Sequence, residues 1–305
     1  MKDASEGRSG VIVIDKHGGV TSNDIVMKIR RLFGTKKVGH TGTLDPMATG
    51  VLPVLIGRAA KAAEYLLAEN KGYVATLKLG VVTDTQDTTG AVLSTCDCLP
   101  TAEAVLAACA SFLGEGEQIP PMYSALKVDG KKLVDLARAG IEVERKARPI
   151  TIYSLDVTPL SPEAGEYELR VRCSKGTYIR TLCHDIGAKL GCGGAMASLR
   201  RTESGSFTLN EAHTIEELET MTEDERYALL CPTESLFSDR VAVTLPAFYA
   251  KLSRNGAEIY LNKIGQSLAE GTAVSLHDGE GFYGIGTVRA YPDGLAIRTE
   301  KLFVL

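Results

Sequence analysis

Apolar and polar residues follow two different periods along the first third of the chain, one typical of strands and one of helices. Residues 11–14 are consecutive aliphatic residues, which predict a short buried strand. Residues 71–82 alternate between polar and apolar side chains, which predicts a second strand with Tyr73 on its apolar face. Between them, residues 21–33 gather apolar side chains on one side behind capping residues and predict a helix that ends at Gly34.

The middle of the chain continues this mixture without a regular alternation of strands and helices. Residues 59–68, 101–113 and 177–190 have a helical pattern. Residues 151–157 and 166–173 predict a pair of strands. A doubly wound sheet would need strands and helices in strict succession, so we expect an α+β fold.

The composition changes near residues 244–246, after an acidic helical stretch. The tail beyond this point contains short β-like runs separated by turn residues. These runs span residues 272–276, 281–288 and 294–299. The full length of 305 residues suits one large domain and one small one. We therefore expect a large domain over residues 1–243 and a small β-rich domain over residues 244–305.

The composition is that of an ordinary globular protein, with 44% hydrophobic and 24% charged residues. The first ten residues are polar, and the apolar run after them is too short for a signal peptide or a membrane span, so we expect a cytoplasmic protein without a membrane partner. The 7 cysteines are scattered and include no C-x-x-C pair. They suit reduced thiols better than disulfides or a metal site.

The formal net charge of −4 argues against a strongly basic nucleic-acid-coating protein, but the charge is distributed unevenly. Residues 1–61, 127–148 and 170–201 carry net charges of +5, +3 and +6. Residues 80–126 hold six acidic and no basic residues, and residues 211–240 carry −7; we expect both on the surface, away from any nucleic acid. If the basic segments converge, they form a cleft for a polyanion; otherwise they are solvated helix faces.

The densest group of candidate residues lies in the loop over residues 39–50. Its glycines allow a close approach to a ligand, and its single carboxylate, Asp45, directly precedes Pro46. Such a carboxylate can act as a nucleophile or a general base. The alternative is that Asp45 caps a neighbouring turn.

Two further positions have a functional and a structural interpretation. Arg180 follows a Ser-Lys-Gly-Thr turn in the first turn of a predicted helix, where free amides could hold a phosphate. Arg180 could instead pair with a carboxylate and keep it ionised, or lie on the surface. Tyr73 could stack on a base or simply pack in the core with its hydroxyl at the rim.

Taken together, these segments resemble the TruB family, whose members are tRNA pseudouridine-55 synthases. The resemblance covers residues 11 to about 240 in the expected order, and the HTGTLDP block at residues 40–46 is its most specific part. The tail, especially residues 282–286, resembles the PUA-like RNA-binding domain of the family. His17 departs from the pattern, because the family usually has proline there. The other matching segments are Asp15-Lys16, Gly19, Thr21-Ser22, Gly50-Val51-Leu52-Pro53, Lys71-Gly72-Tyr73 and residues 118–127, 137–148 and 173–180.

The resemblance implies a catalytic domain built on a mixed, largely antiparallel sheet flanked by helices, followed by a small β-rich PUA-like domain. It also implies isomerisation of a uridine in the T-loop of tRNA at position 55, by base flipping, cleavage of the glycosidic bond, rotation of the uracil and rejoining through C5. This reaction involves no redox change, in agreement with the absence of cofactor and metal motifs. Residues 126–148 match an insertion that grips the T-arm, and we expect a monomer.

The resemblance also implies a role for individual residues. Asp45 matches the catalytic aspartate, which either attacks the ribose or base or removes a ribose proton. Arg180 matches its partner. Tyr73 matches the residue that stacks on the uracil and takes the C5 proton.

Four more positions match residues that bind the substrate. His40 lies beside the flipped nucleotide, and Leu199 lines the pocket. Lys16 lies at the pocket edge or contacts the backbone, and Tyr178 contacts the substrate.

Two other classes of protein remain as alternatives. A noncatalytic tRNA-binding or folding chaperone would need the basic segments, but not Asp45, Tyr73 and Arg180 together. A phosphotransferase would need a glycine-rich G-x-x-x-x-G-K-[ST] loop, and the sequence contains none.

Overall fold

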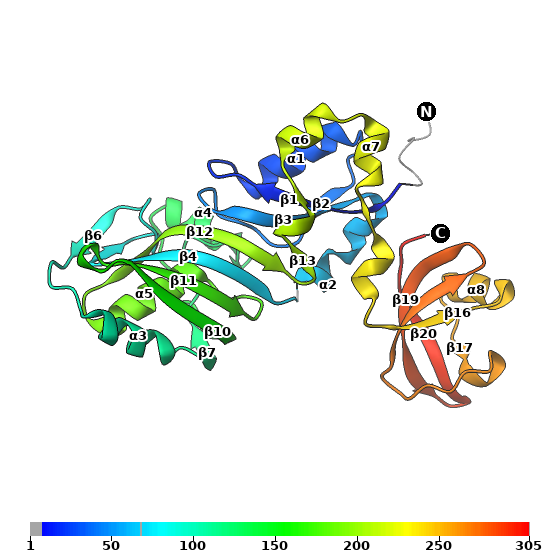
Figure 1. The fold of residues 1–305 in the computed structure, drawn as a ribbon. Coiled ribbons are helices and arrows are strands. Elements are labelled where there is room, and N and C mark those ends of the chain that lie inside the picture. The colour runs from blue at the N-terminus through cyan, green and yellow to red at the C-terminus, as the bar shows by residue number, and fades with distance from the viewer. Residues whose placement is uncertain (1–7, 68, 305) are drawn as a thin grey trace.

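Two β-sheets of unequal size form the framework of the molecule (Figure 1). The computed structural model describes residues 8–67 and 69–304. The larger sheet has 11 strands, and the smaller one, near the C-terminus, has 5. Helices cover the larger sheet without alternating with every strand, which confirms the predicted α+β fold.

Most neighbouring strands of the larger sheet run antiparallel. Its strands are β1 (Gly10–Lys16), β2 (Val38–His40), β3 (Thr49–Ile56), β4 (Lys71–Leu79), β7 (Gly114–Gln118), β10 (Arg148–Ser161), β11 (Glu166–Cys173), β12 (Gly194–Ser204), β13 (Phe207–Thr208), β14 (Ala212–His213) and β15 (Cys231–Pro232). The main path runs β14-β1-β3-β12-β4-β11-β10-β7. Within the described residues its parallel neighbours are β1 with β14 and β3 with β12. The predicted mixed, largely antiparallel sheet is confirmed.

Helices and two short hairpins complete the larger part of the molecule. The helices are α1 (Ser22–Leu32), α2 (Ala63–Leu67), α3 (Ala102–Ala110), α4 (Leu133–Arg138), α5 (Ile179–Leu190), α6 (Ile215–Thr220) and α7 (Glu223–Ala228), with 3-10 turns at Gly57–Ala62, Pro162–Ala164, Leu209–Glu211 and Thr233–Phe237. The hairpins pair β5 (Val81–Thr83) with β6 (Val92–Thr95) and β8 (Lys127–Val128) with β9 (Lys131–Lys132). No helix in the described ranges has the length and apolar character needed to cross a bilayer.

The predicted helix after residue 20 shows how local sequence sets an element. Thr21 caps α1: its side chain accepts a hydrogen bond from the Asp24 amide, and the Asp24 carboxylate accepts one from the Thr21 amide. The chain leaves the helix at Gly34, which has φ +59°. The apolar face of α1 packs on β1 beside α6, so the helix joins the main core (Figure 1).

Two elements predicted from the pattern of apolar and polar residues are interrupted in the structure. The strand expected over residues 71–82 breaks at Gly80, which has φ +83° and bonds to two segments through its amide and carbonyl. β4 therefore ends at Leu79, and Val81 begins a separate hairpin. The helix expected over residues 59–68 is a 3-10 turn followed by α2; residue 68 itself lies outside the described residues.

The C-terminal sheet has its own core and meets the larger part through aromatic side chains. It consists of β16 (Val241–Thr244), β17 (Ile259–Tyr260), β18 (Ala273–Asp278), β19 (Gly281–Tyr291) and β20 (Gly294–Leu302), with helix α8 (Ala247–Arg254) and a 3-10 turn at Leu261–Lys263. The three predicted β runs are confirmed as β18, β19 and β20. At the junction, Phe237 packs on Phe282 and Phe303, and Tyr65 meets Phe237 edge-on. A Lys301–Glu64 ion pair of 2.6 Å adds a polar contact.

Gly50 provides a test of the packing between β3 and β12. Gly50 has φ +99°, and a Cβ at this position would collide with the Arg201 backbone. We expect Gly50→Ala to lower the free energy of unfolding by more than about 3 kcal/mol, because strain and overlap add. Urea denaturation measures this loss.

Gly34→Ala is the matched control. Gly34 also has a positive φ, but nothing among the described residues comes within 4 Å of its Cβ position. The free energy of unfolding of Gly34→Ala should therefore fall by only about 1 to 2 kcal/mol, from backbone strain. Equal losses for the two variants would contradict the close approach at Gly50.

Candidate active site

The loop between β2 and β3 that carries Asp45 is anchored by a buried lysine. Lys16, the last residue of β1, is 0% exposed. Its ammonium donates hydrogen bonds to the carbonyls of His17, Pro46 and Ala48, at 2.9, 3.3 and 2.6 Å. Burial lowers the pKa of Lys16, and the Asp45 charge opposes that shift. All three acceptors belong to the protein itself, and the carbonyl at position 17 would be available with proline as well.

A second anchor comes from helix α1. The Ser22 hydroxyl accepts a hydrogen bond from the Leu44 amide at 2.8 Å and donates one to the Leu44 carbonyl at 3.1 Å. Leu44 and Pro46 are thus both tied down, on either side of Asp45. The Asp45 side chain projects from a loop held at two points, which limits the directions that it can take.

Asp45 points at Arg180 of helix α5, and the two side chains form a two-pronged ion pair. Arg180 Nε lies 3.0 Å from Asp45 Oδ2, and Arg180 Nη2 donates to Asp45 Oδ1 at 3.3 Å. The Arg180 side chain is 7% exposed and that of Asp45 is 32% exposed. Of the three interpretations of Arg180, the structure supports pairing with a carboxylate. The turn after Asp45 is closed by its backbone carbonyl, which accepts from the Ala48 amide.

The interpretation of the α5 N-terminus as a phosphate site does not agree with the structure. The Tyr178 amide donates to the side-chain oxygen of Gln118 at 2.9 Å, and Gln118 donates back to the Tyr178 carbonyl at 3.2 Å. Arg180 and Thr181, in the first turn, are buried. The first turn of α5 therefore faces the protein rather than a ligand.

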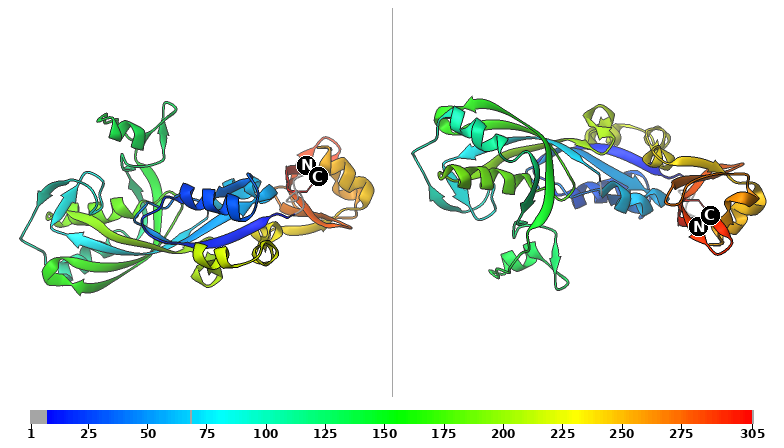
Figure 2. Two further views of the ribbon diagram at one scale, coloured as in Figure 1. Left: turned by 90° about the horizontal axis from the view of Figure 1, so that it is seen from above. Right: turned by 90° about the horizontal axis from the view of Figure 1, so that it is seen from below.

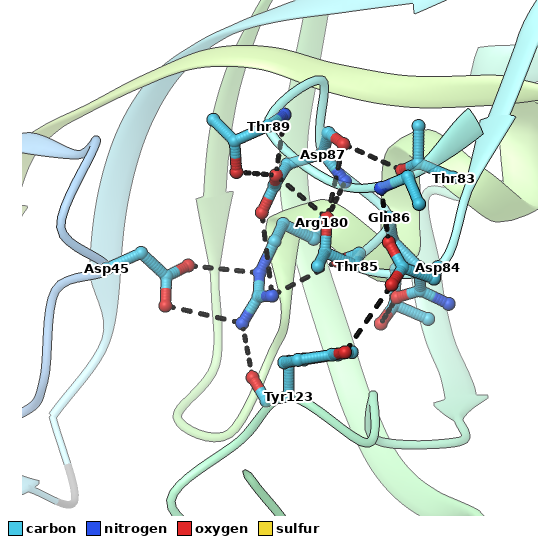
Figure 3. Close-up of polar contacts among 11 residues, drawn as sticks. Asp45, Thr83, Asp84, Thr85, Gln86, Asp87, Thr89, Tyr123 and Arg180 are labelled. Atoms are coloured by element: carbon cyan, nitrogen blue, oxygen red, sulfur yellow. Dashed lines mark hydrogen bonds and ion pairs between the residues drawn. The ribbon is translucent and has the colours of Figure 1, made fainter. Parts of the chain in front are cut away.

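The other partners of Arg180 are Thr85, Asp87 and Tyr123, which were not among the predicted site residues (Figure 3). Arg180 Nη1 donates to the Thr85 carbonyl at 3.1 Å and lies 3.6 Å from Asp87 Oδ2. Arg180 Nη2 donates to the Tyr123 carbonyl at 2.7 Å. The guanidinium therefore contacts both carboxylates and two carbonyls at once.

Asp87 corrects the expectation for the acidic segment at residues 80–126. The other acidic residues of this segment are exposed as predicted, namely Asp84, Asp97, Glu103, Glu115 and Glu117, but Asp87 is 5% exposed. Its Oδ1 accepts hydrogen bonds from the Thr89 amide and hydroxyl and from the Thr85 hydroxyl, at 3.0, 2.5 and 2.9 Å. The dense Thr and Asp content of residues 83–89 is the signal that could have identified this turn.

The electrostatic environment of Asp45 combines opposing effects. Burial raises the pKa of Asp45, Arg180 lowers it, and the charge of Asp87 raises it again. Because one guanidinium faces two carboxylates, it neutralises only part of their charge. Asp45, the more exposed of the two, is the carboxylate that a ligand can reach.

A second buried arginine connects Tyr73 to the same loop. Arg201 is 1% exposed and is the register partner of Tyr73 across β12 and β4. It donates to the Val51 carbonyl at 2.6 Å and the Gly42 carbonyl at 3.3 Å. Burial raises the pKa of Tyr73, and the neighbouring guanidinium opposes this shift. Tyr73 belongs to the main core cluster, and Arg201 was not among the predicted site residues.

The remaining candidate residues surround these two arginines. His40 ends β2, directly before the Asp45 loop, and burial lowers its pKa. Leu199 is buried on β12 opposite Ala75 and shares the core cluster of Tyr73. Burial raises the pKa of Tyr178, and the Asp45 charge adds to this shift.

The arrangement places the partly exposed Asp45 carboxylate against the buried Arg180 guanidinium. The part of the chain that the structure describes holds no group of three or more His, Cys, Asp or Glu side chains placed to bind a metal ion. The chemical groups that converge here are a carboxylate, a guanidinium and a phenol. Such a set suits nucleophilic or general-base chemistry on a neutral ligand.

Comparison with known proteins agrees with this reading. Residues 30–179 match the model of the TruB family pseudouridylate synthase N-terminal domain, and residues 180–238 match the tRNA pseudouridylate synthase B C-terminal domain. The chain is 49% identical over 247 residues to tRNA pseudouridine synthase B of Aromatoleum aromaticum, covering 81% of this chain and 80% of that protein. It is 45% identical over 303 residues to tRNA pseudouridine synthase B of Burkholderia mallei, covering 99% of each.

A solved structure also shares the fold. A chain from the crystal structure of a Cbf5-Nop10-Gar1 complex superposes with a TM-score of 0.72 and 25% identity, covering 100% of this chain and 88% of that one. Fold and site together define a pseudouridine synthase. The chain belongs to the TruB family of pseudouridylate synthases, and the resemblance predicted from the HTGTLDP block is confirmed.

Lys16→Met tests the anchor of the Asp45 loop. The variant keeps an unbranched side chain of similar length but leaves the Pro46 and Ala48 carbonyls without their buried donor. We expect the free energy of unfolding to fall by about 2 to 4 kcal/mol, measured by guanidinium denaturation. Lys28→Met is the control, because it removes only a surface ion pair with Glu219 and should cost less than about 1 kcal/mol. A loss at Lys16 no larger than at Lys28 would contradict the anchoring role.

Proposed function

We propose that this protein isomerises uridine to pseudouridine at position 55, in the T-loop of tRNA, with Asp45 as the catalytic carboxylate. The observation that carries the proposal is the two-pronged pair between the accessible Asp45 and the buried Arg180. The tRNA substrate is supported by the name of the relatives at 45% and 49% identity, tRNA pseudouridine synthase B.

The proposed reaction begins with a flipped uridine. The N1 glycosidic bond breaks, the uracil rotates, and C1′ rejoins the base through C5. The C5 proton leaves and N1 gains a proton, so the atoms balance without oxidation or reduction. Asp45 either attacks the ribose or base, or removes a ribose proton, and both roles need the ionised carboxylate. Arg180 supplies the charge that keeps Asp45 ionised although burial raises its pKa.

The proposal also assigns roles to the residues around Asp45 once the uridine has left its stack. In the proposal, Tyr73 stacks on the uracil, which is worth roughly 1–3 kcal/mol, and Leu199 lines the pocket. Tyr73 also takes the C5 proton in the proposal; burial raises the pKa of its phenol, and the neighbouring Arg201 opposes that shift. His40 lies beside the vacated position, and burial keeps its ring neutral by lowering its pKa. Tyr178 and Lys16 border the site.

The insertion at residues 126–148 is the proposed grip on the T-arm. Figure 2 shows this segment, with α4 and a short hairpin, projecting from the body of the molecule. The basic residues Lys127, Lys131, Lys132, Arg138, Lys146 and Arg148 are exposed on it. The proposed reaction uses Asp45, Arg180 and Tyr73 of one chain and needs no residue of a second copy, and we propose that the enzyme acts as a monomer.

The alternative of a noncatalytic tRNA-binding or folding chaperone explains less of the structure. A binding surface needs exposed cations, whereas the guanidiniums of Arg180 and Arg201 are buried and bonded to the protein itself. Burying charged groups is costly unless they are fully paired, and here the pairing serves to orient Asp45. The arrangement therefore favours catalysis over binding alone.

Asp45→Asn tests the catalytic role. The amide keeps the size of the side chain but can neither attack nor accept a proton as a carboxylate does. We expect pseudouridine formation to be abolished and tRNA affinity to stay within a few-fold of wild type. Release of tritium from C5-labelled unmodified tRNA measures turnover, and pseudouridine mapping identifies the position.

Asp97→Asn makes the same chemical change at an exposed loop residue and should retain full activity. Appreciable turnover by Asp45→Asn would remove Asp45 from its role. Product at a uridine outside the T-loop would overturn the substrate assignment.

Exchanging Lys131 and Lys132 for glutamate tests the insertion. Both are exposed on β9, so the change should act on RNA rather than on the core. We expect tRNA affinity to fall about tenfold or more, with a weaker dependence on salt, because fewer phosphates are neutralised. The rate at saturating tRNA should stay close to wild type.

Lys189→Glu, at the opposite end of α5 from Arg180, is the control for a single charge reversal outside the insertion. It should change the affinity by less than twofold. Filter binding over a range of salt concentrations measures the tRNA affinity and its dependence on salt. An equal loss for both variants would argue against a specific grip by the insertion.

A further inference from the structure

The turn that presents acceptors to Arg180 contains a residue in a backbone conformation that its side chain disfavours. Gln86 has φ +64°, in the left-handed region that glycine, asparagine and aspartate occupy more readily than glutamine. Asp129, at the tip of the β8–β9 hairpin, is the other residue with a positive φ among the described residues other than glycine. A strained position in an interior turn must be held by its surroundings.

The position of Gln86 connects this conformation to the active site. On one side is Thr85, whose carbonyl accepts a hydrogen bond from Arg180 at 3.1 Å. On the other side is Asp87, whose carboxylate lies 3.6 Å from the same guanidinium. The dihedral angles of Gln86 therefore set whether both neighbours can face Arg180 at once (Figure 3).

Both the backbone and the side chain of Gln86 are tied to other elements. Its amide donates to the Thr83 carbonyl at 3.3 Å, and its carbonyl accepts from the Met196 amide of β12 at 3.0 Å. Its side-chain oxygen accepts a hydrogen bond of 2.8 Å from the Thr181 hydroxyl. Thr181 is 2% exposed and directly follows Arg180 in helix α5.

The direction of the Thr181 hydroxyl is informative. Thr181 lies in the first turn of α5, so no preceding turn of its own helix offers a carbonyl to its hydroxyl. Here the hydroxyl donates instead to Gln86, 95 residues away along the chain. The bond joins helix α5 to the turn at residues 83–89, which supplies acceptors to Arg180. Within α5 it is made by the residue next to Arg180.

We propose that Gln86 and Thr181 are a pair of positioning residues, which hold the turn at residues 83–89 and helix α5 in one register so that Arg180 stays aimed at Asp45. The inference rests on the proposed function of Asp45. Without the side-chain bond, the turn at residues 83–89 is no longer tied to helix α5, and the Thr85 carbonyl and Asp87 shift relative to the guanidinium. Arg180 then loses fixed partners, although no charge and no substrate contact has been removed.

Thr181→Val tests the pair, because it removes the hydroxyl while keeping the shape. We expect the single-turnover rate of pseudouridine formation to fall about tenfold, with tRNA affinity within twofold of wild type. The acid limb of the rate profile should move to higher pH: a less well aimed Arg180 leaves the raised pKa of Asp45 less opposed, and activity is lost as pH falls through that pKa. Thr181→Ser, which keeps the hydroxyl, should stay within twofold of wild type in all three measurements.

Gln86→Gly separates positioning from stability. Glycine accepts the positive φ without strain but lacks the side-chain bond, so the variant should be at least as stable as wild type toward urea and still lose about tenfold in rate. The double variant with Thr181→Val should be no slower than either single variant, since both remove the same bond. The proposal is overturned if either single variant keeps the wild-type rate, or if the two losses add in the double variant. It is also overturned if Thr181→Ser loses as much rate as Thr181→Val, or if only tRNA affinity falls.

One measurement does not depend on turnover. The Nε–H resonance of Arg180, assigned by its disappearance in Arg180→Lys, should exchange slowly with water in wild type and Thr181→Ser, and faster in Thr181→Val and Gln86→Gly. Unchanged exchange in both of these variants would overturn the positioning role. If the wild-type protein forms no pseudouridine while the exchange rates follow this order, the proposed function fails and the structural link stands.

Discussion

A buried guanidinium is the constraint around which the candidate active site is built. Arg180 needs acceptors for its N–H groups, because an unpaired charge in the interior would cost several kcal/mol. The acceptors come from the Asp45 loop, the turn at residues 83–89 and the segment before the insertion. Regions far apart in the sequence are therefore fixed relative to one another by the needs of one side chain, and Asp45 is the more exposed of its two carboxylate partners.

Arg201 repeats this arrangement on the other side of the Asp45 loop. It bonds to the carbonyls of Gly42 and Val51 and borders Tyr73, so the loop lies between two buried cations. Gly50 lets β3 approach the Arg201 backbone more closely than any side chain would allow. The glycines of this loop are therefore as much a matter of packing as of access for a ligand.

The sequence predicted the parts that depend on local pattern and missed those that depend on distant partners. The apolar face of β4 and the Thr21 cap of α1 follow from periodicity and capping alone. Asp87 and Arg201 were missed because a charged residue is expected on the surface unless its partner is known, and their partners lie on other elements. The interruption at Gly80 was also missed, because its conformation is set by hydrogen bonds to neighbouring segments.

The charge distribution acquires a different meaning once the buried residues are known. The segment at residues 170–201 has a net charge of +6, but Arg180 and Arg201 are buried. Three more of its cations are paired with acids: Arg170 with Glu168, Arg172 with Glu203 and Arg200 with Asp15. Much of this positive charge serves the fold. The insertion has a smaller excess of +3, but its cations are mostly exposed, so it can attract a polyanion more effectively than the larger total elsewhere.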